Sequence, residues 1–275
     1  MVIISFNIEV AQFLTFFYII ILLVLLILNI NSPSNIKEQK PNIKNIDIKL
    51  TTNTTNKTNK KQNLVIQKLN MDINLFPFIT PFRLIIAGPS GSGKTTFVQK
   101  LLDEKHILNP EPKHKIWFYA QYQSWYEKYP NITFIQGIPK LSFFKSNSSY
   151  LVVIDDLFQY LNKELTQLFA CDSHHKNISV IFLTQNIFHK SAETRNISLN
   201  ATHLVIFKNP RDQLQISHLG KQMFPGKSSY LVEVFKDATK KPFSYLLIDL
   251  TPEIDDQFRL RANIFIVDGF TRIYQ

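Results

Sequence analysis

The feature that most constrains this chain is a glycine-rich loop between two segments of expected regular structure. Residues 88–95 read Gly-Pro-Ser-Gly-Ser-Gly-Lys-Thr and match the pattern G-x-x-x-x-G-K-[ST] at every fixed position. The apolar run 84–87 precedes the loop and predicts a buried strand, and a helix is expected from Thr96 to Lys105. Glycines allow backbone N–H groups to converge on an anion, and the start of a helix adds further free N–H groups. This arrangement predicts a phosphate-binding loop.

The loop predicts ATP and Mg²⁺ as the bound cofactors. Lys94 is expected to reach the β- and γ-phosphates, and the Thr95 hydroxyl is expected to be a ligand of Mg²⁺. The expected phosphate-binding residues are Gly88, Pro89, Ser90, Gly91, Ser92, Gly93, Lys94, Thr95 and Thr96.

A second apolar strand is expected at 150–155, and it ends in two carboxylates, Asp155 and Asp156. Asp155 is predicted to hold Mg²⁺ together with Thr95, because carboxylate and hydroxyl oxygens suit this cation. Asp156 is predicted to orient or deprotonate the attacking water. Acidic residues are common at strand ends, and the phosphate loop upstream is what makes a catalytic interpretation specific.

A third apolar strand at 178–184 ends in Gln185, whose amide is predicted to detect the γ-phosphate. The alternative for Gln185 is an amide that satisfies backbone groups at the strand end. Arg195, in a polar stretch where no helix is expected, is a candidate arginine finger for a neighbouring subunit, and Arg211 competes for that role. The alternative for Arg195 is an ordinary surface residue.

Apolar strands without alternation, separated by helical segments, indicate an α/β fold with a mostly parallel sheet between helices. We expect one domain over residues 71–250, and a polar, peripheral tail over 251–275.

The N-terminal quarter differs in composition. Residues 10–30 carry no charge and would span about 31 Å as a helix, so we predict a single membrane anchor within an N-terminal region 1–30. An extension of the gene model or an unusual signal sequence are the alternatives. Residues 31–70, rich in Asn, Thr and Lys, are predicted to be a disordered linker.

Charge sets the expected orientation of this anchor. Only Glu9 precedes it, whereas residues 31–70 carry eight lysines against two acidic residues, which also account for much of the net charge of +10. Positive charge on the C-terminal side predicts that the globular domain faces the cytoplasm. If the anchor is not genuine, the nucleus, the cytoplasm or a site of virion assembly is expected instead.

Four segments together resemble the FtsK–HerA superfamily of ATPases, and most closely its viral genome-packaging branch, which includes poxvirus-like and Maverick/Polinton-type members. The similar segments are the phosphate loop, the Leu-Val-Val-Ile-Asp-Asp strand 151–156, and residues 173–186 and 195–212. The resemblance extends over about 81–250. It implies a RecA-like core, assembly into a homo-oligomeric ring and ATP-driven movement of double-stranded DNA. The spacing of Asp155 from Lys94 resembles the additional-strand class of phosphate-loop ATPases, which usually has Glu where Asp156 stands, so the identity of the catalytic base stays open.

Other functions remain as alternatives. A membrane-tethered nucleotide switch or scaffold with little hydrolysis would also need the phosphate loop. A GTPase is disfavoured because Asn162-Lys163-Glu164-Leu165 lacks the Asp of the guanine-reading motif N-K-x-D. A small-molecule kinase would need an Arg-rich lid, and the sequence has none that we can identify.

Overall fold

The computed structural model describes residues 68–72, 76–145, 147–157, 160, 162–173, 176–188 and 192–275. Within these ranges no helix has the length and apolar character needed to cross a membrane. The predicted anchor 10–30 and almost all of the predicted linker 31–70 lie outside the described residues and stay predictions.

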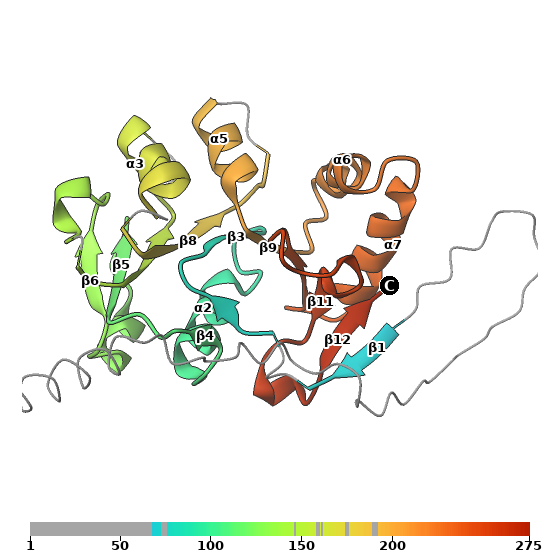
Figure 1. Cartoon of the computed structure of the whole chain (residues 1–275), viewed down its shortest axis with the longest axis horizontal. Coiled ribbons are helices and arrows are strands. Elements are labelled where there is room, and N and C mark those ends of the chain that lie inside the picture. The colour runs from blue at the N-terminus through green and yellow to red at the C-terminus, as the bar shows by residue number, and fades with distance from the viewer. Residues whose placement is uncertain are drawn as a thin grey trace, which may run out of the picture. The chain divides into compact units, whose positions relative to one another are not determined.

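A ten-stranded sheet forms the centre of the described part, in the order β1-β12-β11-β10-β9-β3-β8-β7-β5-β6 (Figure 1). The six strands from β9 to β6 are parallel, and the four strands from β10 to β1 are antiparallel additions at the β9 side. The strands are β1 (Lys68–Met71), β3 (Arg83–Ala87), β5 (His114–Tyr119), β6 (Thr133–Gln136), β7 (Tyr150–Asp155), β8 (Ile178–Thr184), β9 (His203–Phe207), β10 (Tyr245–Asp249), β11 (Leu260–Ala262) and β12 (Thr271–Tyr274). The short strands β2 (Phe78–Ile79) and β4 (Leu108–Asn109) pair separately.

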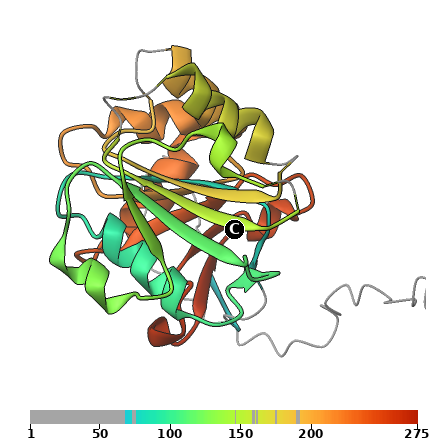
Figure 2. The same ribbon diagram turned by 90° about the vertical axis from the view of Figure 1, so that its left-hand side faces the viewer.

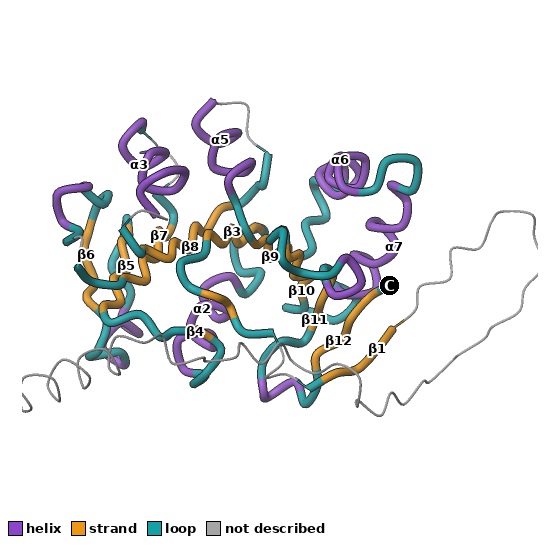
Figure 3. Tube along the Cα trace, viewed as in Figure 1, coloured by secondary structure: helices purple, strands orange, loops and turns teal. Residues whose placement is uncertain are grey.

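Helices cover both faces of this sheet (Figure 3). Helix α2 lies on one face, and α3, α5, α6 and α7 lie on the other. Figure 2 shows the same arrangement from the side, with the yellow and orange helices above the strands. The helices are α2 (Lys94–Asp103), α3 (Lys163–Gln167), α5 (Ala192–Asn200), α6 (Leu214–Met223) and α7 (Ser228–Ala238).

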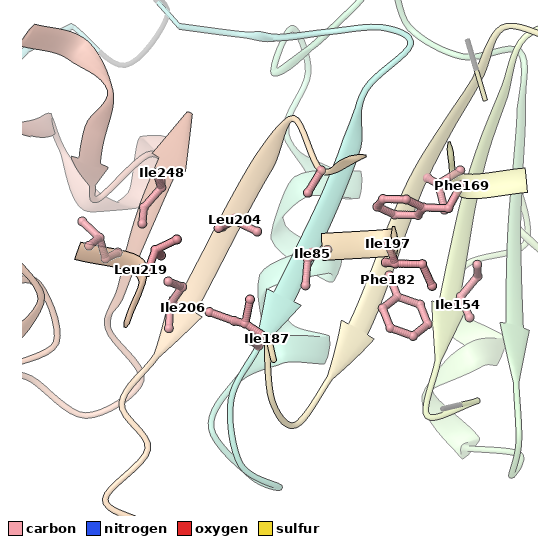
Figure 4. Packing of buried hydrophobic residues seen from close by; sticks show 14 of the residues in the cluster. Ile85, Ile154, Phe169, Phe182, Ile187, Ile197, Leu204, Ile206, Leu219 and Ile248 are labelled. Carbon is pink, nitrogen blue, oxygen red and sulfur yellow. The ribbon is translucent and has the colours of Figure 1, made fainter. Parts of the chain in front are cut away.

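The central strands are apolar along their whole length because alternate residues face two different cores. In β3, Ile85 packs toward α5 and α6 with Phe182 and Leu204 (Figure 4), whereas Leu84 and Ile86 pack toward α2. Burial on both faces requires helices on both sides, as parallel sheets do. The prediction of an α/β fold with a mostly parallel sheet is therefore confirmed.

The expectation of a peripheral tail over 251–275 was wrong. This segment supplies β11 and β12, and its residues Phe265 and Tyr274 are each only 1% exposed. Its charged residues made it look polar, but one of them, Arg261 of β11, is buried and bonded to Asp249 at 2.7 Å. Burial alone would raise the pKa of Asp249, but His203 and Arg261 hold it well below its usual range. Polar residues paired across strands are invisible to sequence periodicity.

Two other expectations are corrected: the end of the linker, and the absence of a helix around Arg195. The last residues of the predicted linker, from Lys68, form β1 and pair with β12. The stretch expected to lack a helix is α5, which spans Ala192–Asn200. Its polar sequence hides only two buried residues, Thr194 and Ile197, and Ile197 packs into the core beneath α5 (Figure 4). Tertiary packing rather than helix propensity therefore accounts for α5.

The C-terminal strand predicts a stability effect. Tyr274 is buried and its hydroxyl donates to Asp237 Oδ2 at 3.0 Å. Tyr274→Ala is expected to lower the free energy of unfolding by about 3–5 kcal/mol, because it removes a large core side chain. Urea denaturation of the two proteins measures the difference.

Val267→Ala is the matched control, since Val267 lies in the same C-terminal segment but is 75% exposed. This change is expected to stay within about 0.5 kcal/mol. Equally small effects at both positions would contradict the packing of β12 into the sheet.

Candidate functional site

A cavity of about 810 Å³ opens where the parallel strands end, around the loop that follows β3. Because β3, β7 and β8 are parallel neighbours, their carboxyl ends meet at one edge of the sheet. Most of the predicted site residues line this cavity: Ser90, Gly91, Gly93, Lys94, Thr95, Thr96, Asp155, Asp156 and Gln185. Gly88 lines a small adjoining pocket with Gln185, and Pro89 and Ser92 belong to the same loop without lining either space.

The backbone of the loop depends on glycine at two points. A Cβ at Gly88 would stand 2.7 Å from Phe207 Cβ, so no larger residue fits. Gly93 has φ of 105°, in a region that disfavours side chains, and is the N-cap of α2. No side chain caps α2, and its first turn has no acidic residue. The free N–H groups at this helix start therefore suit an anion.

Lys94 extends over the loop, and its Nζ donates to the carbonyl oxygens of Gly88 at 2.7 Å and Pro89 at 2.9 Å. Burial lowers the pKa of Lys94, while the charges of Asp155 and Asp156 oppose that shift. The ammonium group is thus held between the phosphate loop and the two carboxylates.

Asp155 is only 8% exposed, and its Oδ2 is buried without a hydrogen-bond partner. Burial raises its pKa to about 6, although the neighbouring Trp117 indole N–H and the charge of Lys94 oppose the rise; the charge of Asp156 adds to it. Asp156 is exposed and adopts a left-handed φ of 54°, which Asp tolerates better than most residues. The turn allows both successive carboxylates to line the cavity.

The donor set fits a magnesium ion. The unbonded Asp155 Oδ2 and the Thr95 side chain line one cavity, and both offer oxygen, the ligand atom that Mg²⁺ prefers. Thr95 and Asp155 are therefore the residues that would hold the ion.

The segment after β8 is fixed by a polar network that sequence analysis missed. Gln215 of α6 is 8% exposed; its Oε1 accepts from the Ile187 N–H at 2.8 Å and its Nε2 donates to Asn186 Oδ1 at 3.1 Å and Asp212 Oδ2 at 2.5 Å. The network joins the ends of β8 and β9, on either side of β3. It therefore fixes the backbone that carries Gln185, itself exposed to the cavity.

Gln123, between β5 and β6, is a further cavity residue that sequence analysis did not single out. Its Oε1 accepts from the Trp125 indole N–H at 2.6 Å. An indole N–H can only donate, so the amide orientation is defined and its NH₂ group is left for another acceptor. The position of Gln123 depends on the aromatic cluster around Trp125, which no local motif reveals.

Neither candidate arginine lines the cavity of its own chain. Arg195 is exposed on α5, and Arg211 is exposed in the loop after β9, where its N–H donates to Asn209 Oδ1 at 3.1 Å. The structure thus brings together the loop, both carboxylates and Gln185, and leaves both arginines outside.

The parallel sheet, the phosphate loop at the end of β3 and the carboxylates beside it define a P-loop nucleotide-binding protein. A family model described as the Poxvirus A32 protein matches residues 77–250, well over half of the chain. The chain belongs to this family. The match confirms the resemblance to the poxvirus-like branch of packaging ATPases.

Solved structures show only distant similarity. The genome packaging NTPase B204 from Sulfolobus turreted icosahedral virus 2, in complex with sulfate, is 14% identical and aligns over 66% of this chain and 95% of that one, with a TM-score of 0.45. The pCW3 conjugation coupling protein TcpA is 13% identical and aligns over 68% of this chain and 63% of that one, with a TM-score of 0.39. The N-terminal domain of zonular occludens toxin from Neisseria meningitidis is 13% identical and aligns over 48% of this chain and 79% of that one, with a TM-score of 0.30. No curated protein matches the sequence.

The raised pKa of Asp155 predicts a pH-dependent stability effect. An unfolded Asp has a pKa of about 3.9, so above pH 6 the folded protein bears the free-energy cost of an ionised buried carboxylate, and below pH 4 that cost disappears. Asp155→Asn is therefore expected to raise the free energy of unfolding by about 2 kcal/mol at pH 7.5, and by less as the pH falls from 6 to 4. Denaturant titrations at several pH values measure this.

Asp156→Asn is the matched control, because Asp156 is exposed and Asn also tolerates the left-handed backbone. It is expected to change stability by less than about 0.5 kcal/mol at every pH. A loss of stability in Asp155→Asn at pH 7.5 would contradict the electrostatic account.

Proposed function

We propose that this protein is a Mg²⁺-dependent ATPase that moves double-stranded DNA, working as a multimeric ring. The observation that carries the proposal is the meeting of the phosphate loop, Asp155, Asp156 and Gln185 at one cavity, in a chain of the Poxvirus A32 family.

Binding of the triphosphate would use groups that are already arranged. The free N–H groups of the loop and of α2 would surround the β-phosphate, and Lys94 would exchange its bonds to the Gly88 and Pro89 carbonyls for phosphate oxygens. The exchange keeps the ammonium group hydrogen-bonded in both states.

Hydrolysis would depend on the carboxylate end of the cavity. A magnesium ion held by Thr95 and Asp155 supplies charge neutralisation at the phosphates when it is bound. Asp156 would orient the attacking water, and the amides of Gln185 and Gln123 would donate to the oxygens of the γ-phosphate.

A ring would complete this site. Fixed positive charge beside the γ-phosphate accelerates phosphoryl transfer, yet neither Arg195 nor Arg211 lines the cavity of its own chain. Both are exposed, as a residue must be if it acts on a neighbouring subunit.

Lys94→Ala is expected to lower the rate of ATP hydrolysis by about 100-fold or more, because a charged donor to the transferred phosphate is lost. The measurement is phosphate release with Mg²⁺, with and without double-stranded DNA. Lys105→Ala is the control: it removes an exposed lysine just beyond the end of the same helix, outside the cavity lining, and should retain turnover.

If the rate of ATP hydrolysis by the wild-type protein depends on neither Mg²⁺ nor DNA, this would argue against a DNA motor. Nucleotide binding with negligible turnover under all conditions would favour the nucleotide switch instead.

Mixing two inactive variants tests the shared site. If Arg195 acts on the next subunit, Lys94→Ala and Arg195→Ala proteins should each be inactive, and their mixture should regain part of the activity. Some interfaces in the mixed ring pair an intact Lys94 with an intact Arg195. Arg211→Ala, taken through the same mixing experiment, decides between the two arginines, and no recovery with either would count against a finger in trans.

A further inference from the structure

The cavity around the phosphate loop has two chemically different ends. Asp155, Asp156 and Gln185 follow β7 and β8, on one side of β3. Aromatic side chains line the other end, mainly from the β9 and β10 side of β3: Phe97, Phe207, Phe243, Tyr245 and Phe265. A triphosphate held by the loop with its γ-phosphate toward the carboxylates would extend its remaining part toward the aromatic end.

Four of these aromatic residues form a packed floor. The ring centroids of Phe97 and Tyr245 lie 4.8 Å apart, and those of Phe97 and Phe265 lie 4.9 Å apart. Phe207 packs against Tyr245 at 5.7 Å, and all four residues are less than 9% exposed. Their faces are occupied by one another, so the floor gives the cavity its shape and offers little free ring surface.

Phe243 is different, because it is 71% exposed at the rim of the same cavity. Its φ of 60° lies in the left-handed region, which a bulky residue rarely adopts. The turn that carries it is closed by bonds from the Ser244 N–H and Oγ to the Lys241 carbonyl, at 3.3 and 2.6 Å. A large apolar ring is thus held at the surface by a strained, hydrogen-bonded turn.

The side chain of Phe243 lies directly beside the end of the phosphate loop. Its Cβ and Cδ1 are each 3.7 Å from the point where a Cβ on Gly93 would stand. Gly93 precedes Lys94 and starts α2, so the ring is adjacent to where the phosphates would be bound.

Few polar side chains at this end could recognise the edge of a base. Among the described residues that line it, Thr96 and Lys100 are polar, and neither carries an amide or a carboxylate. The Tyr245 hydroxyl is buried and accepts from the Ile264 N–H at 3.2 Å. Stacking on an aromatic ring needs no such groups, and every base has a face to stack.

We propose that Phe243 is the base-binding platform of this protein, and that its ring stacks on the nucleobase of the bound nucleoside triphosphate. The site then holds a purine by its face rather than by its edge, so adenine and guanine nucleotides bind with similar affinity. This inference rests on the proposed nucleotide-binding function of the same cavity.

An exposed phenylalanine also suits a contact between copies of the chain. Ile266 and Val267, which follow Phe265 in the sequence, are 61% and 75% exposed. The position of Phe243 on the cavity rim, against Gly93, favours the base instead, and the experiment separates the two.

The test compares ligands with and without a base in wild-type and Phe243→Ala proteins. Dissociation constants for ADP, GDP and inorganic pyrophosphate are measured by calorimetry on the full chain. Loss of one stacking partner is expected to weaken the binding of ADP and of GDP by about 5- to 100-fold, with a similar factor for each. The dissociation constant of pyrophosphate, which has no base, should change by less than about twofold.

Phe243→Trp keeps an aromatic face and should retain the wild-type affinity for ADP. Ile266→Ala removes an exposed apolar side chain outside the cavity lining and should leave all three ligands unchanged. These variants separate stacking from a general loss of apolar surface.

Five results would overturn the inference. Unchanged ADP binding in Phe243→Ala would show that the ring does not contact the base, and equal losses for ADP and pyrophosphate would show that it acts on the loop. A changed oligomeric state by light scattering with unchanged ADP affinity would assign Phe243 to a subunit interface. A strong preference of the wild-type protein for one purine would reveal recognition of the base edge. Failure of the wild-type protein to bind either ADP or pyrophosphate would instead refute nucleotide binding itself, and the base platform with it.

Discussion

The site depends on the burial of β3 in the middle of a parallel sheet. Its residues pack into both cores, and its carboxyl end is hydrogen-bonded to its neighbour, with the Gly88 N–H donating to the Thr184 carbonyl at 3.2 Å. The phosphate loop therefore starts from a rigid position. Because β7 and β8 run in the same direction, their terminal side chains meet that loop without any further device.

The antiparallel strands on the β9 side serve both stability and the site. β10 and the segment between β11 and β12 supply Tyr245 and Phe265, which form part of the aromatic floor of the cavity. The same extension buries Arg261 against Asp249. A charged pair in the interior is stable only when both partners are present, so the C-terminal strands are bound to β10 by electrostatics as well as by backbone pairing.

At the carboxylate end of the cavity the pKa shift has the opposite sign: the pKa of Asp155 is raised, whereas the pKa of Asp249 is lowered. Asp155 is buried with an unbonded oxygen, and burial raises its pKa to about 6. Its ionised form therefore carries a desolvation cost, which a bound cation would offset. The network around Gln215 shows the contrasting solution, in which both ends of a buried amide are bonded. A buried carboxylate thus lies at the cavity, whereas the buried amide behind it is bonded at both ends.

The sequence by itself determined the phosphate loop, the central strands and the residues that follow them, because these signals are local: glycine spacing, apolar runs and the polar residues at their ends. It also predicted that Asp155, Asp156 and Gln185 meet, since parallel strands end at one edge. Only the tertiary structure decided the roles of α5, β1, β11 and β12, whose strand pairing or burial rests on partners far along the chain, such as β12 for β1 and Asp249 for Arg261. The same holds for Gln123, Gln215 and Phe243: their positions come from contacts across the fold, which residue type and spacing do not encode.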